Sequence, residues 1–152
     1  MIDRFVLDCS VAAKWYLLDE EGVDDAELIL TQLLDGEIEL HAPEFLKYEL
    51  GNALTKAQRT KGRGHSNDQS GNAYQTFSSL PIRFHQQDSP SLQEALLFAN
   101  QFQRSFYDSC YLVLAVRLGC PWLTAEKKFR GPFPIGFPRN LIHILGSPTK
   151  SV

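Results

Sequence analysis

The stretch from 105 to 129 constrains the fold more than any other part of the chain. Residues 108–118 are apolar almost all round, which predicts a helix buried on most sides. Gly119 lies where a left-handed residue commonly ends such a helix. Residues 122–124 form a short apolar run that predicts a buried strand. The stretch therefore predicts a buried helix, a tight turn and a buried strand in succession.

Short apolar runs alternate with helical patterns along the rest of the chain. Strands separated by helices in this way are typical of an α/β sandwich with a mainly parallel sheet. The helix that opens at 89–90 has serine at its cap and proline at its first position, and we expect Leu92, Leu96 and Ala99 to pack inward. The predicted strands are 5–8, 38–42, 82–84, 122–124 and 141–145, and the other predicted helices are 11–18, 24–35, 44–61 and 66–80.

Length and composition fit one globular domain, since the chain has 152 residues and 43% hydrophobic content. We expect a single domain over 1–146 and a frayed C-terminal tail over 147–152. No apolar run is long enough to span a bilayer, and the N-terminus begins with Asp3 and Arg4 and lacks the apolar stretch of an export signal. We therefore expect a soluble, cytoplasmic protein.

Cysteine content and net charge narrow the kinds of site that the chain can carry. The three cysteines form no C-x-x-C pair, and their odd number argues against a disulfide framework. A net charge of -3 is not typical of a protein whose whole surface attracts nucleic acid, so a nucleic-acid site would need a local basic patch or bound cations. His41 has no second histidine at metal-binding spacing, and we interpret it as structural.

Four acidic residues occupy positions where the predicted fold would present functional groups. Asp8 ends the first predicted strand, and Glu126 follows a later one by two residues. Glu49 borders the apolar stripe of a helix, and Asp108 lies in the first turn of the buried helix. Because the carboxyl ends of parallel strands meet at one edge of a sheet, these distant acids can come together. Close carboxylates repel one another unless cations are present, and Mg²⁺ or Mn²⁺ suits such oxygen ligands.

Each acid also has an ordinary structural interpretation. Asp8 or Ser10 can cap the helix that follows the first strand. Asp108 can gain from the helix dipole in a capping box with Ser105, three residues before it. Glu126 can be a solvated loop acid beside two lysines.

The segments 5–17, 43–54 and 107–129 together resemble the PIN-domain ribonucleases, and within them the VapC-like toxins of type II toxin-antitoxin pairs. Their order and spacing span nearly the whole chain. The resemblance implies a PIN-like three-layer α/β/α sandwich and a Mg²⁺-dependent endoribonuclease that hydrolyses RNA phosphodiester bonds, with Mn²⁺ as a substitute metal. It also implies a homodimer, an RNA substrate, no membrane, and a small antitoxin protein whose C-terminal segment blocks the site.

The same resemblance assigns roles to individual residues. The acids that correspond to the family's catalytic and metal-binding core are Asp8, Glu49, Asp108 and Glu126. The family's fourth acid is usually aspartate, so the longer side chain of Glu126 reaches the metal either directly or through water. Supporting polar positions are matched by Ser10, Asn52 and Thr124, and Asn52 is within hydrogen-bonding reach of Glu49. Candidate cations for flanking phosphates are Lys14, Lys47, Arg104, Lys127 and Lys128.

Three other classes of protein are alternatives to this interpretation. A PIN-like module could bind RNA or a protein partner without cleavage, because the fourth acid has changed. A phosphatase with an aspartyl nucleophile is suggested by Asp8 at the end of a strand, but that chemistry needs a second aspartate where Ser10 stands. A receiver-like signalling domain also fails, because no adjacent pair of acids ends the first strand.

Overall fold

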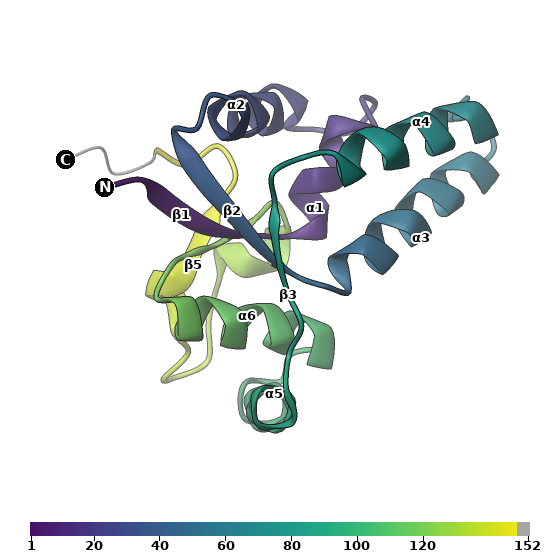
Figure 1. Cartoon of the computed structure of the whole chain (residues 1–152). Coiled ribbons are helices and arrows are strands. Elements are labelled where there is room, and N and C mark those ends of the chain that lie inside the picture. Colours follow the sequence, from purple (N-terminus) through teal and green to yellow (C-terminus); the bar gives the residue numbers. More distant parts are fainter. Residues whose placement is uncertain (149–152) are drawn as a thin grey trace.

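The computed structural model describes residues 1–148, so most of the tail predicted for 147–152 lies outside the described residues. Within these residues the chain forms one sheet of five strands and six α-helices (Figure 1). The strands are β1 (Asp3–Leu7), β2 (Ile38–Pro43), β3 (Arg83–His85), β4 (Trp122–Thr124) and β5 (Ile142–Ile144). The α-helices are α1 (Cys9–Ala12), α2 (Val23–Leu34), α3 (Leu46–Arg59), α4 (Asn67–Ser78), α5 (Ser89–Phe102) and α6 (Phe106–Leu118). Short 3₁₀ helices are η1 (Ala13–Trp15), η2 (Lys127–Arg130) and η3 (Arg139–Leu141).

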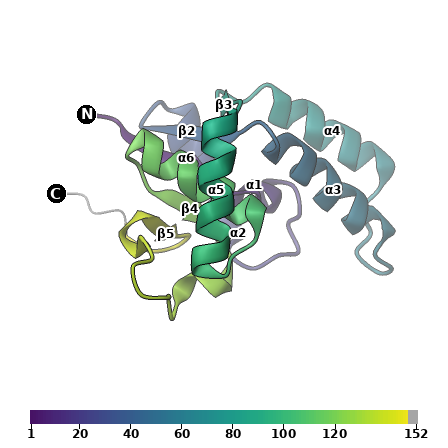
Figure 2. The same cartoon turned by 90° about the horizontal axis from the view of Figure 1, so that it is seen from below.

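All strand pairs in the sheet are parallel, in the order β3-β2-β1-β4-β5. Helices cover both faces, with α2 on one side of the sheet and α5 and α6 on the other (Figure 1). The helices α3 and α4 lie side by side and project away from the sheet in both views (Figures 1 and 2). The predicted three-layer α/β/α sandwich is confirmed, and its sheet is wholly parallel. No helix within the described residues is both long and apolar enough to cross a membrane.

The central helix α6 and strand β4 form as their apolar pattern predicts. Ser105 caps α6 by accepting a hydrogen bond from the Asp108 N–H at 3.0 Å, and Gly119 ends it with φ 64°. Seven consecutive residues of α6, Ser109 to Ala115, are buried. Tyr111 stacks on Trp122 of β4 with ring centroids 5.3 Å apart and planes at 7°. The helix therefore packs directly on the strand that follows it in sequence.

The prediction for helix α5 was wrong in two respects. Its cap is Asp88, whose carboxylate accepts the Ser91 N–H at 2.9 Å, so the helix begins one residue earlier than the serine-proline pair suggested. Leu92 and Leu96 are 37% and 53% exposed. The buried face carries the small side chains of Ser91 and Ala95, and small residues allow the close approach of α5 to α6.

The helix predicted for 11–18 is shorter than expected and begins earlier. The structure has α1 from Cys9 to Ala12, followed directly by the 3₁₀ turn η1, which ends at Trp15. The reason for the early start is the cap at Asp8, whose side chain accepts the N–H of Ser10. The other predicted helices and strands agree with the structure to within two residues at each end.

Candidate active site

The candidate site lies at the carboxyl ends of the adjacent strands β1 and β4. The backbone N–H of Asp8, one residue beyond β1, donates to the Leu123 carbonyl at 3.0 Å. This places the Asp8 side chain beside Thr124, the last residue of β4. A cavity of about 450 Å³ opens at this edge. Its lining includes the four predicted acids and two of the predicted supporting residues, namely Asp8, Glu49, Asp108, Glu126, Ser10 and Asn52.

Asp8 is the most deeply buried of the four acids and is only 5% exposed. Its carboxylate accepts hydrogen bonds from the Thr124 hydroxyl at 3.1 Å, from the Ser10 N–H at 3.3 Å and from the Ser10 hydroxyl. Burial raises the pKa of Asp8 to about 7, and the charges of Glu49 and Glu126 act in the same direction, although the two hydroxyls oppose the rise. The residue thus caps α1 and also presents a carboxylate that is costly to keep charged without a cation.

The hydroxyl groups of Ser10 and Thr124 connect the first turn of α1 to the loop that follows β4. The Thr124 side chain is fully buried, donates to Asp8, and accepts the backbone N–H of Glu126 at 3.1 Å. The Ser10 hydroxyl also donates to Asp8 and accepts the backbone N–H of Ala125 at 2.9 Å. Each hydroxyl therefore uses both its donor and an acceptor lone pair, which holds the Asp8 carboxylate in one orientation.

Glu49 reaches the cavity from the first turn of α3 and is half-buried. The Tyr111 hydroxyl of α6 donates to its Oε1 at 2.6 Å. Burial raises the pKa of Glu49, the Tyr111 hydrogen bond opposes this, and the charges of Asp108 and Glu126 raise the pKa further. Asn52 lines the same cavity, but within the described structure its side chain makes no hydrogen bond to Glu49.

Asp108 lies in the first turn of α6 and is paired with a lysine. The Lys128 Nζ lies 2.7 Å from Asp108 Oδ2, with the two side chains 47% and 17% exposed. Burial alone would lower the pKa of Lys128, but the hydrogen bond to Asp108 and the nearby carboxylates raise it. The lysine is therefore a fixed positive charge beside the acids.

Glu126 is the most exposed of the four acids. It precedes the 3₁₀ helix η2, and its backbone is held by Thr124. Its side chain lines the cavity and makes no hydrogen bond within residues 1–148. Its solvated position agrees with the ordinary interpretation of a loop acid, while its place on the cavity wall agrees with the metal-site interpretation.

The five basic residues predicted to hold phosphates lie in different places. Lys14 lines the cavity and pairs with Glu20 at 3.3 Å. Lys47 pairs with Glu44 at 2.8 Å, and its ammonium group lies over the ring of Phe84 in β3.

The remaining basic candidates lie on or near the loop after β4. Lys127 is 75% exposed and lies 3.7 Å from Glu21. Arg104 lies over the rings of Phe129 and Phe137, 5.4 Å from each centroid.

Two charged residues that the sequence interpretation did not select, Glu20 and Lys56, also line the acidic cavity. Their sequence positions resemble ordinary surface charges, so no sequence signal distinguished them.

The side chains around this cavity suit a hard divalent cation in their chemistry. All of the predicted ligands are oxygen donors, which Mg²⁺ and Mn²⁺ prefer, and the buried Asp8 carboxylate is stabilised by nearby positive charge. Among residues 1–148, however, no three carboxylate, histidine or cysteine side chains are gathered closely enough to hold a metal ion as they stand. Lys128 supplies the positive charge at Asp108 in this arrangement.

A parallel α/β/α sandwich with four carboxylates around one cavity at the sheet's carboxyl edge defines the chain as a PIN-like α/β protein with an acidic site. No family model matches the sequence. The chain is 27% identical over 134 residues to Ribonuclease VapC3 of Pyrobaculum aerophilum, a match that covers 86% of this chain and 95% of that protein.

Solved structures with a similar fold include a toxin-antitoxin complex from Klebsiella pneumoniae, which has a TM-score of 0.59 at 12% identity and matches over 89% of this chain and 93% of that one. VapC20 of Mycobacterium tuberculosis, described as a toxin that cleaves the sarcin-ricin loop, has a TM-score of 0.59 at 14% identity and covers 83% of this chain and 92% of its own. VapBC2 of Rickettsia felis, solved with a DNA fragment from its promoter, has a TM-score of 0.64 at 14% identity. The match covers 93% of this chain and 98% of the Rickettsia chain. The PIN-like fold and the resemblance to VapC-like proteins are therefore confirmed.

Proposed function

We propose that the chain is a divalent-metal-dependent endoribonuclease and the toxin of a toxin-antitoxin pair, with RNA as its substrate and a small antitoxin protein as its partner. The observation that carries this proposal is the convergence of Asp8, Glu49, Asp108 and Glu126 on one cavity. The relative named as a ribonuclease supports the same reaction, and the structures of toxin-antitoxin complexes support the partner. The proposal includes a homodimer, as the family resemblance implies.

In this proposal Asp8, Glu49 and Asp108 would hold Mg²⁺, or Mn²⁺ as a substitute, and Glu126 would be a fourth ligand, either direct or through water. When bound, such a cation activates water and neutralises charge on the scissile phosphate. Neighbouring side chains orient the carboxylates: the hydroxyls of Thr124 and Ser10 donate to Asp8 and fix its orientation.

The other ligands are prepared by neighbouring side chains. Tyr111 orients Glu49 through its hydroxyl, which makes that carboxylate a better-defined ligand. Lys128 provides a positive charge beside Asp108 that can hold a phosphate oxygen. Because Lys128 is half exposed, its ammonium group is accessible to a substrate as well as to the acid.

The site assignment is tested by matched substitutions of two aspartates that both lie in the first turn of a helix. Asp108→Asn should keep the fold and abolish metal-dependent cleavage, whereas Asp68→Asn in α4 should leave cleavage unchanged. Both variants remove a charge that interacts with a helix N-terminus, so a loss confined to Asp108 reports on the site. A folded Asp108→Asn variant with wild-type cleavage would refute the assignment.

Substitution of Glu126 shows whether the site needs only a carboxylate at this position or needs the longer glutamate side chain. Glu126→Asp restores the residue type usual in the PIN-domain family, and we expect it to retain or increase cleavage. A large loss of activity, measured as initial rate on the same RNA, would mean that the longer side chain is required for the reaction.

A second candidate function is a catalytically weak or silent module that binds RNA or a protein. The pairing of Lys128 with Asp108 at 2.7 Å favours it, because the lysine already neutralises one proposed ligand. Such a module should keep its binding when Asp8 is replaced by Asn. Under the nuclease proposal, the same substitution removes cleavage.

A further inference from the structure

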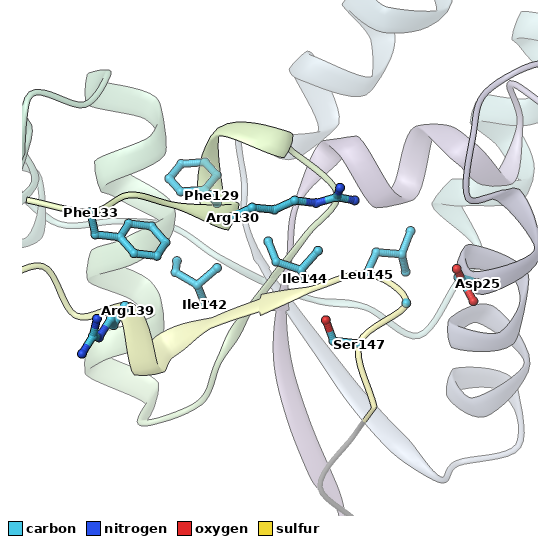
Figure 3. Close-up of a pocket in the computed structure, with 10 residues that line it drawn as sticks. Asp25, Phe129, Arg130, Phe133, Arg139, Ile142, Ile144, Leu145 and Ser147 are labelled. Atoms are coloured by element: carbon cyan, nitrogen blue, oxygen red, sulfur yellow. The ribbon is translucent and has the colours of Figure 1, made fainter.

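A second cavity, larger than the acidic one, lies beside the edge strand β5. Its volume is about 570 Å³. We call it the β5 groove and define it by two arginines, one aromatic ring and three aliphatic side chains: Arg130, Arg139, Phe133, Ile142, Ile144 and Leu145. Figure 3 shows Ile142 and Ile144 on the same side of the strand, with Arg139 near one end of the set and Arg130 extending over Ile144 toward the other.

The two arginines give the β5 groove a net positive charge. Neither Arg130 nor Arg139 lies within 4 Å of a carboxylate oxygen in residues 1–148. One acid, Asp25, also lines the cavity, but its carboxylate is packed against Gly146, where an added Cβ would come within 2.8 Å of Asp25 Oδ2. The formal charge of the lining is therefore +1, and both guanidinium groups remain available to an anion.

Most basic residues near the acidic cavity are in a different situation, although Lys56, which also lines it, has no carboxylate oxygen within 4 Å among residues 1–148. Lys14, Lys127 and Lys128 each lie within 4 Å of a carboxylate oxygen, as does Lys47 farther away. Their charge is offset by those acids before any ligand binds. The arginines of the β5 groove are thus better placed than these lysines to hold additional phosphates.

One short chain segment and one backbone hydrogen bond place the β5 groove next to the acidic cavity. The 3₁₀ helix η2 carries Lys128, which contacts Asp108, and ends two residues later at Arg130. On the other side, the Leu145 N–H donates to the carbonyl of Thr124 at 2.9 Å, and the hydroxyl of Thr124 contacts Asp8. A polyanion that occupies the acidic cavity can therefore continue into the β5 groove.

The apolar lining suits the uncharged parts of a nucleotide. The ring of Phe133 is half-buried and stacks on Phe137, with centroids 4.7 Å apart and planes at 4°, so it is held in a fixed orientation. Ile142 and Ile144 are also only partly buried. Single-stranded RNA is commonly bound by such a combination of an aromatic platform for a base and arginines for the phosphates.

We propose that the β5 groove binds the single-stranded RNA that flanks the scissile phosphate, with Arg130 and Arg139 on phosphates and Phe133 beneath a base. This inference rests on the proposed ribonuclease function, because the strand is taken to enter from the acidic cavity. An acidic peptide could also use two arginines and aliphatic side chains. The proximity of the groove to the acidic cavity, through η2 and the Leu145 hydrogen bond to Thr124, favours RNA.

The test measures RNA binding without cleavage. Fluorescein-labelled dodecauridylate is titrated with the full chain in EDTA, and anisotropy gives Kd at several salt concentrations. The double variant Arg130→Gln, Arg139→Gln should bind at least tenfold more weakly. Its salt slope should be smaller by about 1.4, because each phosphate of a single strand that an arginine neutralises adds about 0.7 to the slope. The matched double variant Arg59→Gln, Arg117→Gln removes the same charge from exposed positions on α3 and α6, and its Kd should change less than twofold.

Three results would overturn the inference: equal weakening by both double variants, no effect of the groove variant, or a wild-type chain that binds polyglutamate but not dodecauridylate. Circular dichroism of each variant excludes unfolding as the cause of weaker binding. Cleavage in Mg²⁺ is measured separately on the same preparations. Failure of the wild type to cleave RNA, with the groove effect intact, would remove the nuclease proposal and leave RNA binding by the β5 groove.

Discussion

Removal of the Tyr111 hydroxyl should destabilise the protein by loosening the Glu49 carboxylate. The hydroxyl lies 2.6 Å from Glu49 Oε1, and Tyr111 is 1% exposed, so water cannot readily replace it as a donor. A hydrogen bond to a charged group contributes about 1.5–3 kcal/mol. We therefore expect Tyr111→Phe to lower the free energy of unfolding by that amount at pH 8, while the ring keeps its stacking on Trp122.

The pH dependence of this loss identifies its cause. The Tyr111 hydrogen bond lowers the pKa of Glu49, so it stabilises the charged carboxylate and contributes most above that pKa. The difference between wild type and Tyr111→Phe should be larger at pH 8 than at pH 5. Urea denaturation, followed by tryptophan fluorescence in EDTA, measures both values.

Tyr16→Phe is a matched control for this substitution. The Tyr16 hydroxyl is also buried but has no hydrogen-bond partner within the described residues, so its removal should be neutral or slightly stabilising. Equal losses for Tyr16→Phe and Tyr111→Phe would refute the reasoning. A Tyr111→Phe variant as stable as wild type at pH 8 would refute it as well.

Three further predictions concern the groups around Asp8 and Asp108. Thr124→Val should lower the unfolding free energy in urea by about 2 kcal/mol, since it removes a buried hydroxyl that binds Asp8. The pKa of Asp8 in the folded protein is raised from 3.8 to about 7. The metal-free free energy of unfolding should therefore fall as pH rises from about 4 to 7, by at most about 4 kcal/mol. Thermal unfolding of Asp8→Asn should not show this pH dependence. Lys128→Met should raise Mn²⁺ affinity about fivefold in calorimetry by freeing Asp108, whereas Lys127→Met should change it little; equal effects would argue against a specific role for the Lys128 pair.

Local patterns in the sequence were sufficient to predict the elements that build the site. The apolar run of α6, its cap at Ser105, its end at Gly119 and the strand β4 all fall within the single stretch 105–124. The convergence of Asp8 and Glu126 followed from the general property that parallel strands end at one edge of a sheet. These features depend on short-range periodicity and chain direction, which a single sequence shows.

Contacts between distant segments could not be predicted in the same way. The Tyr111 hydrogen bond to Glu49 joins residues 62 positions apart, and the strand order that brings them together is not encoded in periodicity. His41, interpreted as a single structural histidine, has its Nδ1 2.8 Å from Nε2 of His85 on the neighbouring strand β3. Such pairs depend on register between strands.

The exposed leucines of α5 illustrate a different limit. Leu92 and Leu96 have the spacing of a buried stripe, but the helix turns the smaller residues Ser91 and Ala95 toward α6. Apolar spacing identifies a helix and a candidate face, whereas the choice between neighbouring faces depends on the shape of the partner helix. Sequence spacing alone therefore could not select the packed side.

The initial rate of RNA cleavage as a function of Mg²⁺ concentration, for the wild type and Asp8→Asn purified without an antitoxin, tests the proposed metal-dependent site most directly. We expect wild-type cleavage that rises with Mg²⁺ to saturation, is restored by Mn²⁺ and stops in EDTA, and no cleavage by a folded Asp8→Asn variant. Cleavage that persists in EDTA, or that is the same in both proteins, would contradict a metal-dependent reaction at this acidic site.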